Sequence, residues 1–171
     1  MTMLVLERSF EPPLSPQSVI DIARRSAWCF EQYRVEWLGS LLAIDGRSMV
    51  CRFEAPDAES TRQALITIEA DIGRLWEGTT HAVEDPEEPN VIVERSFEAP
   101  VALADVQALE DASQWCLDAR NVRFVKTFFS TDRKRMLCLY RAPDAESVRA
   151  AQHQAQMPLD RVWSFEEVLL R

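Results

Sequence analysis

The chain has 171 residues, of which 47% are hydrophobic and 27% are charged, and these values are typical of a folded globular protein rather than a disordered one. Its formal net charge of −9 disfavours nucleic acid and anionic membrane surfaces as partners, because both carry negative charge themselves. No apolar run approaches the ~18 residues that a membrane span needs, and the N-terminus lacks the basic-then-apolar order of a signal peptide.

The most prominent feature of the sequence is an internal duplication. Residues 4–77 align with residues 91–164 at a constant offset of 87 positions without a gap, and 24 of the 74 pairs are identical. Chance would give only a handful of identities, so the two segments are copies of one unit. We therefore predict a first repeat over residues 1–78, an acidic linker over residues 79–90 and a second repeat over residues 91–171.

Each copy predicts the element order β-α-β-β-α-β. The strands expected in the first copy lie at residues 4–10, 35–42, 48–53 and around Trp76. Ser15 followed by Pro16 is the signature of a helix start, and Asp57 is a second helix cap. The strands expected in the second copy lie at residues 91–97, 122–129, 135–140 and around Trp163. Asp144 takes the place of Asp57 there.

This order predicts an α+β fold built from two tandem ferredoxin-like units. Each unit would be a four-stranded antiparallel sheet with both helices on one face. Packing the two uncovered sheet faces together would give an intramolecular pseudo-dimeric α+β barrel. A homodimer of such chains remains an open alternative.

The four cysteines occupy two equivalent positions in each copy. They are Cys29, Cys51, Cys116 and Cys138, and none forms a close CxxC pair. This pattern predicts buried, reduced thiols in a cytoplasmic protein, with a metal cluster or a disulfide as the alternative.

Three segments of the second copy carry a family resemblance. They are Val93-Glu94-Arg95-Ser96-Phe97, Cys138-Leu139-Tyr140-Arg141-Ala142-Pro143 and Pro158-Leu159-Asp160-Arg161. They resemble the nickel-binding-protein-like family of domains of unknown function, and the resemblance extends over nearly the whole chain, twice. It implies a ferredoxin-like fold and dimeric α+β barrels.

Nickel binding within that family is associated with histidines in the first strand and the second helix. This chain has two histidines, His81 in the predicted linker and His153 in the second helix of the second copy. Because nickel favours imidazole nitrogen, so small a donor set predicts no metal site. No Gly-rich phosphate loop is present either, so no cofactor is predicted.

Strand alternation assigns the polar residues to sheet faces. With Leu6, Trp37 and Cys51 facing the helices, the opposite faces would hold Glu7, Ser40 and Arg52 in the first copy and Glu94, Ser96, Arg123 and Thr127 in the second. Charged groups on a packed face need partners or a wet cavity. We therefore predict that a small organic molecule binds between the two sheets.

Glu94 and Glu7 are the candidate general bases of a cofactor-independent enzyme at this site. The candidate ligand-binding residues are Arg123, Thr127, Ser40, Arg52, Ser96 and His153. The alternative for the glutamates is structural ion pairing, of Glu7 with Arg52 or Arg8 and of Glu94 with Arg95 or Arg123.

Two other functions stay open at this point. One is a divalent-metal (nickel) binding protein, as the family resemblance implies, and the other is a non-catalytic interaction or structural protein. The two copies also differ at the expected interior positions, for example Glu36 against Arg123. We therefore predict that any site uses the two halves unequally, with Glu94 near Arg123 mattering more than Glu7.

Overall fold

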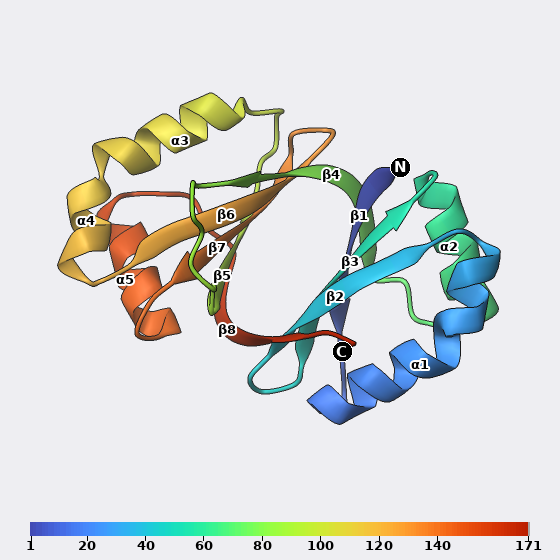
Figure 1. Cartoon of the computed structure of the whole chain (residues 1–171). Helices are drawn as coiled ribbons and strands as arrows, with labels where there is room; N and C mark the ends of the chain where they lie inside the picture. Colours follow the sequence, from blue (N-terminus) through green and yellow to red (C-terminus); the bar gives the residue numbers. More distant parts are fainter. Residues whose placement is uncertain (171) are drawn as a thin grey trace. The chain divides into compact units, whose positions relative to one another are not determined.

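The computed structural model describes residues 1–170 (Figure 1). The chain forms two compact units. The first contains residues 1–78 together with the chain from Phe165 onward, and the second contains residues 79–164. Each unit combines an antiparallel sheet with helices, so the predicted α+β class with two ferredoxin-like units is confirmed.

The first unit has the six elements that the first copy predicts. They are β1 (Thr2–Ser9), α1 (Pro16–Gln32), β2 (Glu36–Ala43), β3 (Ser48–Ala55), α2 (Ala58–Thr67) and β4 (Arg74–Ala82). The strand order β4-β1-β3-β2 is that of a ferredoxin-like sheet. Figure 1 shows α1 and α2 on the same side of this sheet. Both helices begin at the predicted caps, where Ser15 accepts from the Ser18 amide at 3.1 Å and Asp57 from the Ser60 amide at 2.7 Å.

The second unit repeats this plan with one helix broken. Its elements are β5 (Val91–Ser96), α3 (Leu103–Ala112), α4 (Gln114–Ala119), β6 (Arg123–Ser130), β7 (Arg135–Arg141), α5 (Ala145–Gln154) and β8 (Arg161–Val168). The strand order is β8-β5-β7-β6. The helix expected after the first strand is divided at Ser113 into α3 and α4, and its first residue follows Ala102, which provides no side-chain cap.

Two strands run on beyond the predicted boundaries. Residues 79–82, expected in the linker, are the end of β4, and this end lies beside β6 in the second unit. The end of β8, from Phe165 to Val168, pairs with β2 and belongs to the first unit. Each four-stranded sheet therefore gains a short fifth strand at its β2 or β6 edge.

Both copies carry a β-bulge at the same place in their second strand. The register shifts between Trp37 and Gly39 in the pairing of β2 with β3, and between Phe124 and Lys126 in the pairing of β6 with β7. A bulge inserts one residue into a strand, so the side chains that follow it change face.

The prediction that Ser40 and Thr127 lie on the face away from the helices is therefore wrong. Ser40 donates a hydrogen bond to the Cys51 sulfur at 3.0 Å, and the Thr127 hydroxyl lies 3.4 Å from the Cys138 sulfur. Both cysteines belong to the cores beneath the helices.

Each unit has its own hydrophobic core between its sheet and its helices. All four cysteines are buried and free, as predicted. Within residues 1–170, none of the helices has the length and apolar character that crossing a bilayer requires.

Candidate functional site

A buried arginine lies between the sheet and the helices of the second unit. Arg95 follows Glu94 on β5, and because neighbouring strand residues point to opposite faces, Arg95 faces the helices. Its side chain is fully buried and donates to the Tyr140 hydroxyl at 3.0 Å, to Gln152 Oε1 at 2.7 Å and to the Pro158 carbonyl at 2.5 Å. Burial of a guanidinium group requires partners of this kind.

Glu110, on α3, supplies the negative charge for this cluster. Its Oε2 atom lies 3.7 Å from the Arg95 guanidinium and accepts a hydrogen bond from the Tyr140 hydroxyl at 2.6 Å. Burial raises the pKa of Glu110 above its usual value, while the Tyr140 hydrogen bond and the Arg95 charge oppose this shift. Burial also raises the pKa of Tyr140 well above its usual value, which keeps the phenol neutral. The cluster thus balances one buried cation with one carboxylate.

The equivalent arginine of the first unit, Arg8, lacks these side-chain partners. The three positions hold apolar residues there: Ala23 for Glu110, Phe53 for Tyr140 and Leu65 for Gln152. The Nε atom of Arg8 is buried without a hydrogen-bond partner in the described chain, and its guanidinium stacks over the Phe10 ring at 4.8 Å.

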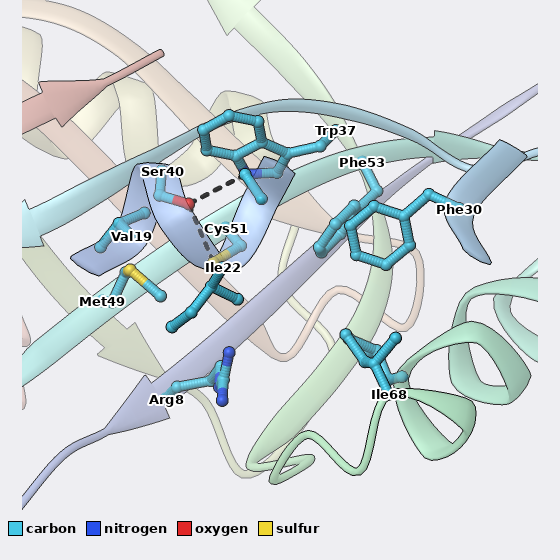
Figure 2. A pocket seen from close by; sticks show the side chains of 12 residues that line it. Arg8, Val19, Ile22, Phe30, Trp37, Ser40, Met49, Cys51, Phe53 and Ile68 are labelled. Atoms are coloured by element: carbon cyan, nitrogen blue, oxygen red, sulfur yellow. Dashed lines mark hydrogen bonds between the residues drawn. The ribbon is translucent and has the colours of Figure 1, made fainter. Parts of the chain in front are cut away.

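A pocket opens beside Arg8 (Figure 2). Its cavity volume is about 40 Å³, and about 410 Å³ is free of protein atoms when the open mouth is included. Its walls are Arg8, Val19, Ile22, Ala23, Phe30, Trp37, Ser40, Met49, Cys51, Phe53, Leu65 and Ile68. None of these twelve residues is acidic. Ser40 adds a polar hydroxyl group to the lining, and this hydroxyl accepts a hydrogen bond from the Trp37 indole at 3.0 Å.

The second unit contains the same pocket in a nearly filled form. By the same measure its interior is about 10 Å³. Six of its eight lining positions match those of the first pocket: Val106, Glu110, Phe124, Thr127, Met136 and Cys138 correspond to Val19, Ala23, Trp37, Ser40, Met49 and Cys51. Glu110 occupies space that Ala23 leaves open. In the second repeat the site is filled and the charge of Arg95 is balanced by Glu110. In the first repeat the site is open and Arg8 has no acidic residue beside it in the pocket lining.

Glu94 and Ser96 come together on the other face of the second sheet, around Arg135. Glu94 accepts from Arg135 at 2.7 Å and from the Trp163 indole at 2.6 Å, with Arg161 at 3.5 Å. Arg135 also donates to Ser96 at 2.7 Å. Sequence reasoning missed Arg135, although the pairing of β5 with β7 places it directly opposite Ser96.

The expected pairing of Glu94 with Arg95 or Arg123 is wrong. Arg95 points to the opposite face. Arg123 is exposed and donates two hydrogen bonds to Glu87, from Nε to Oε1 and from Nη2 to Oε2, the second at 2.8 Å. Along β7, Arg123 aligns with Arg141 while Glu94 aligns with Leu137, four residues away.

The remaining predicted residues are spread over both units. Glu7 accepts from the Trp76 indole at 2.8 Å, and Arg52 reaches Glu167 at 3.3 Å. His153 lies on the exposed side of α5. Its buried neighbour Gln152 contacts the arginine cluster instead.

Comparison with known proteins supports the predicted family. Residues 92–164 match the family described as nickel responsive protein SCO4226-like. The second repeat is therefore similar to this family, as its sequence segments predict. Among curated proteins, none matches this chain in sequence.

Solved structures show the fold over nearly the whole chain. A mutant chlorite dismutase from Candidatus Nitrospira defluvii aligns with a TM-score of 0.52 and 13% identity, covering 96% of this chain and 90% of that one. The provisionally assigned chlorite dismutase TA0507 aligns with a TM-score of 0.52 and 10% identity, covering 98% of this chain and 94% of that one. At these identities the likeness shows a shared fold.

Proposed function

We propose that this protein binds a small organic molecule in the pocket of the first unit, between its sheet and helices α1 and α2. The observation that carries the proposal is the contrast between the repeats. The second unit fills the equivalent space with Glu110, whereas the first unit has Ala23 there and keeps an open pocket. Apolar walls with a few convergent polar groups are typical of ligand sites.

The proposed site lies on the helix side of the sheet, whereas the sequence pointed to the opposite side. Ser40 accounts for part of this change, because the bulge turns it toward the pocket. The roles of Glu94 and Glu7 as general bases stay predictions. Both carboxylate oxygens of Glu94 accept hydrogen bonds, from Arg135 and Trp163, which supports a structural role for Glu94 better than a catalytic one.

Ligand-observed NMR with small aromatic and aliphatic compounds tests the proposal. Compounds that bind the wild-type protein should lose binding to Ala23→Met, because the larger side chain fills the pocket. Ala27→Met is the matched control, since Ala27 lies on the same helix and is exposed. Binding that survives Ala23→Met as well as it survives Ala27→Met would place the ligand elsewhere and refute the proposal.

The family match favours a second candidate function, a response to nickel. The donor residues fit it poorly: within residues 1–170 there is no group of three or more His, Cys, Asp or Glu side chains that could hold a metal ion. Elemental analysis of untagged protein after dialysis separates the two candidates. Stoichiometric nickel that survives dialysis would favour the metal function over the pocket.

A further inference from the structure

We infer that the ligand of the first-unit pocket is a small apolar carboxylate whose acid group pairs with Arg8. The inference rests on the proposed function and adds the chemical class of the ligand. Its basis is the comparison of two arginines, Arg8 and Arg95, that the duplication places at equivalent positions of equivalent strands.

The pocket of the first unit lacks an anion that its counterpart has. A guanidinium group keeps its charge at any pH that a protein tolerates. In the second unit, Glu110 lies 3.7 Å from Arg95 and balances it. The Nε atoms of Arg8 and Arg95 are both buried without a partner in the described chain, so the acid is what differs between them. In the first unit no acidic side chain lines the pocket beside Arg8. An anion from outside the chain would complete the first pocket.

A carboxylate is the anion that suits this position. The protein itself uses a carboxylate at the matching place in the second unit. Guanidinium groups bind carboxylates through two parallel hydrogen bonds, which gives strength and orientation together. Because Ala23 ends at its Cβ atom, the volume that the Glu110 side chain takes in the second unit is available to the acid group of a ligand.

The rest of the ligand must be apolar and compact. Beyond Arg8, the walls are formed mainly by aliphatic and aromatic side chains, among them Ile22, Phe30, Phe53 and Ile68 (Figure 2). An inorganic anion would satisfy Arg8 but leave these walls without contacts. The interior has room for roughly three water molecules, on the order of 90 Å³ of liquid. An organic acid of the size of benzoate, extending into the open mouth, fits this space.

Isothermal titration calorimetry with benzoate and benzamide tests the charge requirement. The two compounds have nearly the same shape, but only benzoate is an anion. We expect benzoate to bind the wild-type protein more tightly than benzamide by roughly tenfold or more, as for hydrogen bonds to charged groups. Arg8→Met should lower the affinity for benzoate to that for benzamide. Arg24→Met, which removes an exposed arginine from α1, is the control and should change neither affinity.

Ala23→Glu provides a second test that does not remove the arginine. The new side chain recreates the arrangement of Glu110 and Arg95 within the first unit, so it should abolish benzoate binding while the melting temperature is kept or raised. This variant also covers the case in which Arg8→Met does not fold.

The outcomes separate the inference from the proposed function. Equal binding of benzoate and benzamide, lost in Ala23→Met and unchanged in Arg8→Met, would overturn the carboxylate and leave the pocket as a binding site. Benzoate binding that persists in Ala23→Glu would also overturn it. Failure of both compounds to bind the wild-type protein would count against the pocket and the carboxylate together.

Discussion

Removing the carboxylate of Glu110 should open the pocket of the second unit, so that it resembles the open pocket of the first unit. In Glu110→Ala, the fully buried Arg95 loses the carboxylate at 3.7 Å, and Tyr140 loses its acceptor at 2.6 Å. Breaking a buried ion pair from one side costs about 3–5 kcal/mol. Because Arg95 keeps its bonds to Gln152 and Pro158, we expect the lower end, about 3 kcal/mol.

The expected loss is large enough for calorimetry. For a chain of this length, about 3 kcal/mol lowers the melting temperature by roughly 6–12 °C. Acetate should then restore part of the loss, because it is small enough to enter the space of the missing side chain and can pair with Arg95. A ligand at 100 times its Kd stabilises the folded state by about 2.7 kcal/mol.

Differential scanning calorimetry in sodium acetate and in sodium chloride of equal ionic strength makes this comparison. The melting temperature of Glu110→Ala should rise in acetate by more than that of the wild-type protein. Asp111→Ala removes an exposed carboxylate one residue further along and should cost less than about 0.5 kcal/mol. Two results would refute this reasoning: a melting temperature of Glu110→Ala equal to that of the wild-type protein, or a melting temperature of Glu110→Ala that is no higher in acetate than in chloride. Either would show that Glu110 does not balance Arg95, and the comparison of the two pockets would fail.

Three further predictions concern pH, the two glutamates and the bulge. Burial raises the pKa of Glu110, so the folded state holds a proton more tightly than the unfolded state; this stability is present below about pH 4.5 and is lost as the pH rises. The melting temperature of the wild-type protein minus that of Glu110→Gln should therefore fall between pH 4 and pH 7, and a constant difference would contradict the raised pKa. Glu94→Gln should cost about 3 kcal/mol and Glu7→Gln less than about 1 kcal/mol in chemical denaturation, because Glu94 is buried and paired with an arginine while Glu7 is half-buried; equal losses would refute this. Gly39→Ala should cost roughly 1–3 kcal/mol, because Gly39 has a φ of +112° and a Cβ atom there would lie 2.3 Å from the Leu169 side chain; a melting temperature equal to that of the wild-type protein would show that the bulge tolerates a side chain.

The repeat alignment contained more information about the pocket than strand alternation extracted from it. Three positions that are polar in the second copy, at Glu110, Tyr140 and Gln152, are all apolar in the first copy, while the arginine is the same in both. A joint difference at three positions beside a shared arginine is a signal that the two copies surround that arginine differently. Nothing in the linear sequence says that the three positions touch the arginine, because they come from one strand and two helices.

The sequence by itself determined the local elements and the duplication. Helix starts depend on a few adjacent residues, so the caps at Ser15, Asp57 and Asp144 were predictable and are observed. Strand periodicity and the family segments were likewise sufficient for the ferredoxin-like order of each copy.

The tertiary structure alone decided which side chains meet. Alternation along a strand assigns faces by counting residues, so the single extra residue of each bulge turned Ser40 and Thr127 toward the helices. Contacts across the sheet depend on the register between strands distant in the sequence, which is why Glu94 meets Arg135 and not Arg123. The state of the two pockets was decided in the same way, because whether the arginine is balanced depends on a residue that a helix brings to it from the other side of the core.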